Sequence, residues 1–214
     1  NHIKTIAQEL GLNEKAVEAA VNLIDEGNTI PFIARYRKEA TGSMDDQVLR
    51  KLGERLDYLR GLDKRRDEVK RSIEEQGAMT EELAQKLEAA ETLARLEDLY
   101  RPYRPKRKTR ASVARARGLA PLAELLLAQN SGTDPEKAAA DYLSGEVPDT
   151  AAALAGARDI LAEQFSDDAA LRQELRELYQ RTALLASKAA DAEKESVYEQ
   201  YYDYAEPVSK VAGH

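Results

Sequence analysis

Apolar residues recur every three, four or seven positions along most of the chain, which is the spacing of one face of an α-helix. The longest series lies between a Ser43 start and a Gln76-Gly77 stop. It predicts a helix of about 33 residues, roughly 50 Å long. Thr80 is a capping residue for a second helix that returns along the first, so we expect a long helical hairpin. The apolar face of the long helix is expected to consist of Leu49, Leu52, Leu56, Leu59, Leu62, Val69 and Ile73.

The rest of the pattern predicts shorter helices that are separated by glycine, proline and capping residues. Pro102 and Pro105 interrupt it, so residues 101–110 are expected to form an extended loop. The fold class that follows is all-α, a multi-helix array with no substantial sheet. The expected helices cover residues 3–10, 14–26, 30–40, 92–100, 111–117, 121–129, 135–143 and 150–165, and a long one that Ser166, Asp167 and Asp168 cap and that runs to about Ala190.

The composition agrees with a helical globular protein. The 214 residues are 43% hydrophobic and 33% charged, and strong helix formers dominate. This length allows one domain or two small bundles, and no change in composition sets a firm boundary. Cysteine is absent, which excludes disulfides and thiolate metal sites and favours a cytoplasmic location. No apolar run approaches the roughly 18–20 residues that a membrane helix needs, so we expect no membrane association.

Catalytic chemistry has little support in this sequence. The two histidines, His2 and His214, lie at opposite ends of the chain, and no glycine-rich phosphate loop is present. The carboxylate pairs Asp45-Asp46 and Asp167-Asp168 both follow a serine at a predicted helix start, where acids complement the helix dipole. We therefore interpret them as capping residues rather than metal ligands. The chain is expected to have no catalytic residue, no metal and no cofactor.

The one segment with a functional pattern is basic. Between Arg101 and Arg117 the chain has eight cations and no acid, although its formal net charge is −7. Without these eight charges the rest of the chain would carry −15. Cations beside a helix start can hold phosphate, and eight phosphate contacts would give a salt slope of about −7 on duplex DNA. The candidate nucleic-acid-binding residues are Arg101, Arg104, Lys106, Arg107, Lys108, Arg110, Arg115 and Arg117.

A second interpretation of the basic segment stays open. Its side chains could pair with the protein's own acidic helices, in which case the segment would be a structural loop. A tyrosine cluster, Tyr198, Tyr201, Tyr202 and Tyr204, could stack on bases, but acids surround it and would repel phosphate. Packing on the helical body or on a following domain is therefore the favoured interpretation of these tyrosines.

Three stretches of the chain resemble a known family. They are NTIPFIARYRKEATGSMDD (28–46), LARLEDLYRPYRPKRKTRASVARARGLAPLA (93–123) and the ending YYDYAEPVSKVAGH (201–214). The first two are similar to the N-terminal region of the bacterial Tex family of transcription accessory proteins, and the ending resembles the stretch that leads into an RNase H-like domain in that family. The likeness covers nearly the whole chain, and the first two stretches are long and specific.

This resemblance implies an organisation and a role that pattern analysis did not show. Residues 1–190 would be the helical N-terminal region, including a helix-turn-helix-like unit, and residues 191–214 an aromatic connector to an RNase H-like domain. The chain would then be an N-terminal fragment of a protein that binds nucleic acid mainly through a C-terminal OB-fold.

The leading hypothesis is a non-catalytic scaffold and nucleic-acid-associated module, with DNA or RNA as partner and the transcription machinery as a further one. The alternatives are a purely structural role and a platform for docking later domains or a protein partner.

Overall fold

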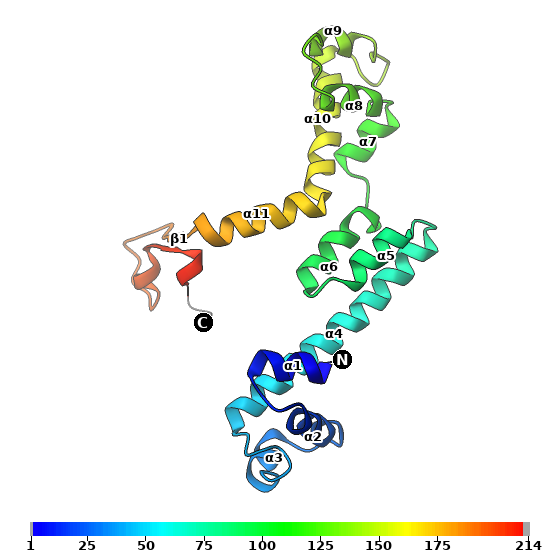
Figure 1. Ribbon diagram of the computed structural model, residues 1–214. Coiled ribbons are helices and arrows are strands. Elements are labelled where there is room, and N and C mark those ends of the chain that lie inside the picture. The colour runs from blue at the N-terminus through cyan, green and yellow to red at the C-terminus, as the bar shows by residue number, and fades with distance from the viewer. Residues whose placement is uncertain (1, 212–214) are drawn as a thin grey trace. The chain divides into compact units, whose positions relative to one another are not determined.

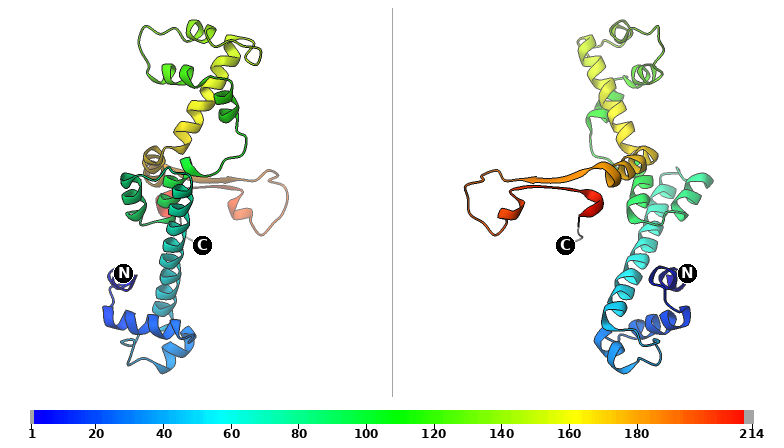
Figure 2. Two further views of the ribbon diagram at one scale, coloured as in Figure 1. Left: turned by 90° about the vertical axis from the view of Figure 1, so that its right-hand side faces the viewer. Right: turned by 60° about the vertical axis from the view of Figure 1, so that its left-hand side comes forward.

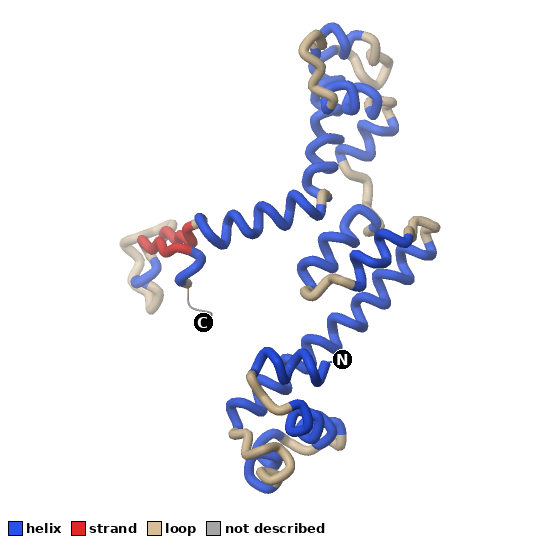
Figure 3. The backbone as a smooth tube through the Cα atoms, in the orientation of Figure 1, coloured by secondary structure: helices blue, strands red, loops and turns tan. Residues whose placement is uncertain are grey.

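The computed structural model describes residues 2–211 (Figure 1). Within that range the chain forms eleven α-helices and one two-stranded antiparallel sheet, which confirms the expected all-α class without a substantial sheet (Figure 3). The chain divides into two compact units, one ending at Leu96 and the other beginning at Glu97. No helix in the described part combines the length and the apolarity needed to cross a membrane.

The N-terminal unit contains five complete helices and the first half of a sixth. Asn13 caps the second helix by accepting hydrogen bonds from the amides of Lys15 and Ala16, and Gly11 ends the first helix with φ +64°. The helices are α1 (His2–Leu10), α2 (Glu14–Asp25), α3 (Ile30–Tyr36), α4 (Asp46–Glu75), α5 (Glu81–Glu88) and α6 (Leu93–Tyr100).

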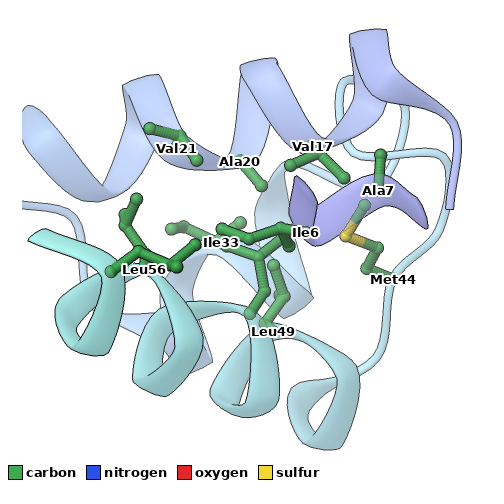
Figure 4. Close-up of a cluster of buried hydrophobic side chains, with 11 residues drawn as sticks. Ile6, Ala7, Val17, Ala20, Val21, Ile33, Met44, Leu49 and Leu56 are labelled. Atoms are coloured by element: carbon green, nitrogen blue, oxygen red, sulfur yellow. The ribbon is translucent and has the colours of Figure 1, made fainter. Parts of the chain in front are cut away.

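The core of this unit lies where α1, α2 and α3 pack on the N-terminal half of α4 (Figure 4). Figure 4 shows Ile33 of α3 between α2 and the α4 residues Leu49 and Leu56, and all three side chains are fully or almost fully buried. Every residue of the apolar series predicted for the long helix is buried, from Leu49 to Ile73. The periodicity therefore identified the buried face of α4 correctly.

Two helix boundaries of the N-terminal unit differ from the sequence expectation. Helix α3 ends at Tyr36 rather than near residue 40, because residues 37–43 form a hydrogen-bonded turn. Helix α4 is capped by Asp45, whose carboxylate accepts a hydrogen bond from the Val48 amide, and not by Ser43, whose φ of +65° places it in the turn.

The predicted hairpin of α4 and α5 is present, and Arg66 links its two helices. The Arg66 guanidinium donates hydrogen bonds to the carbonyl oxygens of Leu87 (3.0 Å) and Ala90 (2.9 Å) at the end of α5, and it also contacts Asp63. A helix end leaves its last carbonyls without intrahelical partners, so a cation there serves as a C-terminal cap. The Arg66 side chain is largely buried in this position.

We expect Arg66→Ala to lower the free energy of unfolding by about 2 kcal/mol, because two carbonyl groups and Asp63 lose a charged donor. Thermal or urea unfolding measures the loss. Arg71→Ala is the control, because Arg71 is exposed on the same helix. Equal stabilities of the two variants would contradict this role.

The C-terminal unit is built along α10 (Thr150–Asp167). The views in Figures 1 and 2 show α7 (Arg110–Ala116), α8 (Ala120–Leu127) and α9 (Pro135–Ala140) beside this helix. The remaining elements are α11 (Ala169–Thr182), β1 (Leu184–Lys188), β2 (Asp203–Pro207) and three short 3-10 turns, η1 (Arg101–Tyr103), η2 (Glu199–Tyr201) and η3 (Val208–Lys210).

Small residues let α10 approach its neighbours closely. Ala114, Leu119, Ala153 and Ala157 are all almost fully buried in this core. Gly156 lies at the tightest point: a Cβ atom there would stand 2.4 Å from Leu119 Cδ1 and 3.3 Å from Ala114 Cβ. This glycine therefore sets how near α7 and α8 lie to α10.

Gly156→Val is expected to destabilise the protein by about 2 kcal/mol, because the close contacts with Leu119 and Ala114 leave no room for the added side chain. Denaturant unfolding of the whole chain measures the change. Gly61→Val is the matched control, since Gly61 lies on α4 with nothing near its Cβ position. A Gly156→Val variant as stable as the control would contradict this prediction, because the core would then have rearranged to accept the larger side chain.

The end of the chain differs most from the sequence expectation. The helix predicted to run to about Ala190 ends at Thr182, and β1 follows it. Leu184 pairs with Pro207 and Ala186 with Ala205, so part of the segment predicted as an aromatic connector forms the second strand of a hairpin. Residues 212–214 of that segment lie outside the described residues. The sequence pattern missed the strand because its partner lies about twenty positions further on.

The tyrosines of this segment belong to the hairpin and its loop. Tyr201 and Tyr204 meet edge to face with ring centroids 5.6 Å apart, and Tyr198 is exposed.

Candidate nucleic-acid interface

The basic segment, residues 101–117, lies beside an acidic face of α10. Asp159, Glu163 and Asp167 are four residues apart and therefore share one side of that helix. Glu163 and Asp167 are the more buried of the three carboxylates, and Asp159 is the more exposed one. This face supplies the negative charge that the basic segment lacks.

The inner cations of the segment are bound to this face. Arg101 donates to Asp167 at 2.9 Å, and Lys106 forms ion pairs with both Asp167 and Glu163. Arg115 on α7 donates to the second oxygen of Glu163 at 2.5 Å. These contacts fix the loop at its start, its middle and in the helix that follows.

Glu163 is the centre of this network. Burial raises the pKa of its carboxyl group, but hydrogen bonds from Arg115 and Thr109 and the charge of Lys106 outweigh burial and lower the pKa below its ordinary 4.5. The carboxylate therefore stays charged in the folded protein at neutral pH. Its contribution to stability is present above pH 4.5 and is lost as the pH falls through the lowered pKa.

Another carboxylate, that of the buried Asp98, holds α6 to α11. Asp98 is 4% exposed and accepts hydrogen bonds from Arg172 (2.6 Å) and Arg176 (2.8 Å). Burial raises its pKa, and the two arginines more than offset this, so that the net shift is downward. The basic segment therefore begins directly after α6, a helix that these ion pairs hold in place. Arg104 is also held near this point, by Glu97 and over the Tyr100 ring.

The start of α7 carries its own cap. Thr109 Oγ1 accepts a hydrogen bond from the Ser112 amide, and Ser112 Oγ accepts one from the Thr109 amide, which completes a capping box. These two backbone donors are satisfied within the protein. The capping box therefore fixes the point at which the loop ends and α7 begins.

The outer cations of the segment are open to solvent. Arg107 and Lys108 are exposed, and neither pairs with a carboxylate of the described residues. Arg110 is 88% exposed with only a long 3.6 Å contact to Asp159, and Arg117 lies 3.7 Å from the exposed Glu146. These four residues, Arg107, Lys108, Arg110 and Arg117, are called the outer cations below.

Three outer cations border a groove between α7 and α10 with a volume of about 530 Å³. Its apolar lining includes Ala152 and Gly156 of α10, and Lys108, Arg110 and Arg117 stand along it. The groove therefore combines small apolar residues with three cations and one carboxylate, that of Asp159.

The eight predicted residues fall into two groups. Arg101, Arg104, Lys106 and Arg115 have close carboxylate partners, whereas the outer cations do not. The sequence did not reveal Asp159, Glu163 and Asp167 as the partners of the first group. Asp159 and Glu163 lie four residues apart on a helix that the sequence did predict. The interpretation of Asp167 as a capping residue was wrong, because α10 continues to Asp167, whose carboxylate pairs with Arg101 and Lys106, and Asp168 alone caps α11.

Comparison with known proteins places this chain in a family. Residues 1–74 match the model of the Tex-like protein N-terminal domain, and residues 130–214 match that of the Tex central region. The chain belongs to the Tex family. The resemblance that its sequence stretches showed is therefore confirmed. The similarity also extends beyond the two matched regions, because curated Tex relatives align with the whole chain.

Two bacterial relatives and one animal relative illustrate the similarity. The transcriptional accessory protein Tex of Neisseria gonorrhoeae and protein tex of Bordetella pertussis are each 47% identical over the whole chain, which covers 28% of either relative. The S1 RNA-binding domain-containing protein 1 of Pongo abelii is 28% identical over 94% of the chain, which covers 20% of that relative. The chain thus spans less than a third of the length of these Tex relatives.

The pH behaviour of Glu163 gives a test of the anchored network. At pH 7 we expect Glu163→Gln to lower the melting temperature, at a cost of about 1–3 kcal/mol, because charged hydrogen bonds are lost. The difference in melting temperature between this variant and the unaltered chain should become smaller as the pH is lowered well below 4.5, because acid protonates Glu163 in the unaltered chain.

Thermal unfolding at pH 7 and at about pH 3 measures both effects. Glu124→Gln, at an exposed position of the same unit, is the control. The same difference in melting temperature at both pH values would show that the charge of Glu163 does not help to hold the loop.

Proposed function

We propose that this chain is a non-catalytic scaffold and nucleic-acid-associated module of a transcription accessory protein. The observation that carries the proposal is the group of outer cations, which a fixed loop and helix hold at the surface without close carboxylate partners. Cations of this kind attract phosphate and release its counterions on binding. The anchored cations supply the scaffold, and the outer cations supply the contact surface.

The division of the cations changes the expected strength of binding. Four phosphate contacts give a salt slope of about −3.6 on duplex DNA and about −2.8 on a single strand, about half of what all eight residues would give. The remaining surface of the chain is acidic and opposes non-specific binding. Affinity is therefore expected to be weak at physiological salt and measurable at low salt.

The groove between α7 and α10 suggests where a nucleic-acid backbone would run. Lys108, Arg110 and Arg117 line it together with small residues such as Ala152 and Gly156, and three cations outweigh the single carboxylate of Asp159. The three-residue link between α7 and α8, which contains Gly118, is typical of a helix-turn-helix unit. We propose these two helices as the unit that the family resemblance implies.

The names of the relatives agree with this role. One is called a transcriptional accessory protein, and another contains an S1 RNA-binding domain. Because the chain spans less than a third of the Tex relatives, we propose that it cooperates with other parts of such a protein in binding DNA or RNA.

A purely structural role is the second candidate, and the buried Asp98 with its two arginines supports it. In that case the basic segment would serve only to attach α6 and α7 to α10 and α11. The two candidates differ in what the outer cations do, because a structural loop has no need of them.

The double charge reversal Arg107→Glu/Lys108→Glu separates the candidates. We expect it to weaken binding of labelled duplex and single-stranded oligonucleotides by about tenfold or more at 50 mM salt, because two phosphate contacts are lost and two repulsions added. Fluorescence anisotropy over a salt series measures both affinity and slope. The melting temperature should hardly change, since both residues are exposed.

Lys64→Glu/Arg71→Glu is the matched control, with the same change in net charge on the exposed side of α4. The proposal fails if the unaltered chain binds neither oligonucleotide at low salt, or if both double variants bind equally well.

A further inference from the structure

The end of α3 presents an aromatic pair at the surface. Phe32 and Tyr36 are four residues apart on one side of the helix, with ring centroids 5.3 Å apart and ring planes inclined by 48°. Tyr36 is 56% exposed, although its neighbour Ile33 is fully buried in the core. The two rings therefore add little to the apolar core and remain available to a ligand.

Cations surround these rings. Residues 27–44 contain Arg35, Arg37 and Lys38 and a single acid, Glu39, in a chain whose net charge is −7. The Arg37 guanidinium lies over the Phe32 ring, 5.2 Å from its centroid, and donates to the Tyr36 carbonyl oxygen at 3.1 Å. Among the described residues none of the three cations forms an ion pair with a carboxylate.

The turn beneath this surface is firmly built. Thr41 is fully buried, and its hydroxyl donates to the Arg37 carbonyl oxygen at 3.1 Å. The Ser43 amide donates to the Lys38 carbonyl oxygen at 2.8 Å, and Ser43 takes a left-handed conformation, φ +65°, that non-glycine residues seldom adopt. Met44 then enters the core. The rings and cations are therefore displayed on a rigid base, which reduces the entropy lost when a ligand binds.

We propose that this surface, Phe32 with Arg35, Tyr36, Arg37 and Lys38, binds single-stranded nucleic acid. An unpaired base stacks on the exposed face of Tyr36, and Arg35 and Lys38 contact the flanking phosphates. An exposed aromatic ring beside cations is the arrangement that single-strand-binding surfaces use, because every base has a stacking face. Duplex is disfavoured, since its bases already stack on one another.

This surface belongs to the N-terminal unit, whereas the outer cations belong to the C-terminal unit. It also differs from them in chemistry. The outer cations offer charge alone and accept duplex or single strand, whereas the α3 surface requires an unstacked base. An acidic peptide could satisfy Arg35 and Lys38 but would gain little from Tyr36, so the ring distinguishes the two classes of ligand.

The test uses the whole 214-residue chain carrying Arg107→Glu/Lys108→Glu, so that binding at the other site is suppressed. Anisotropy of a fluorescein-labelled twelve-nucleotide oligouridine is measured for this chain and with Tyr36→Ala or Tyr36→Phe added. Tyr179→Ala is the matched control, because Tyr179 is 60% exposed on α11. Circular dichroism melting verifies that each variant is folded.

We expect Tyr36→Ala to weaken binding about 5- to 100-fold, the usual effect of removing one stacking ring. Tyr36→Phe retains the ring and should bind within about twofold of its parent, as should Tyr179→Ala. A duplex of the same length should bind more weakly. Equal binding by Tyr36→Ala and its parent overturns the proposal, and so does a loss in Tyr36→Phe as large as in Tyr36→Ala.

Photo-crosslinking gives an independent measurement on the unaltered chain. Oligouridine containing 4-thiouridine should crosslink within residues 32–38, as mapped by mass spectrometry of peptides cut after glutamate, which keep residues 27–39 together. Crosslinks found only outside these residues overturn the proposal for the α3 surface. They leave the separate proposal for the outer cations intact. Polyglutamate is added as a competitor of oligouridine binding. If oligouridine binds Tyr36→Ala and its parent equally, and polyglutamate displaces it equally well from both, the surface is assigned to an acidic protein partner instead.

Discussion

The C-terminal unit depends on three carboxylates along one face of α10. A segment with eight cations and no acid repels itself, and it can settle on a structure only where negative charge is already fixed. Asp159, Glu163 and Asp167 provide that charge at successive turns of a helix whose other residues bury a small apolar core. This pairing holds the loop on α10, and the apolar contact of α7 with Gly156 and its neighbours sets the position of the helix that follows.

Both units show the same relation between net charge and local charge. The chain is acidic, yet each unit leaves a few cations without close carboxylate partners on a base that hydrogen bonds and buried residues hold in place. In one unit the base is α10 with Glu163, and in the other it is the turn that contains Thr41. Net charge therefore describes the average surface and says little about the places where a polyanion could approach.

The sequence predicted the helices well because helix signals are local. The apolar series of α4 and the caps at Asn13 and Thr80 can each be read within a few residues, and all are present. The predicted end of α11 was wrong because β1, which follows it, depends on a partner strand about twenty residues away. The family assignment needed no structure, since two long stretches carried it.

The candidate site could be predicted only in part. The sequence located the basic segment, but ion pairing depends on which helix lies beside it, and that is a tertiary contact. From the sequence alone, the basic segment could either dock on the protein's own acids or bind phosphate. The geometry makes the two compatible, because Arg101, Lys106 and Arg115 fix the segment while Arg107 and Lys108 remain exposed. A loop ordered by its inner cations has already lost its conformational entropy on folding, so a ligand that meets its outer cations need not order it again.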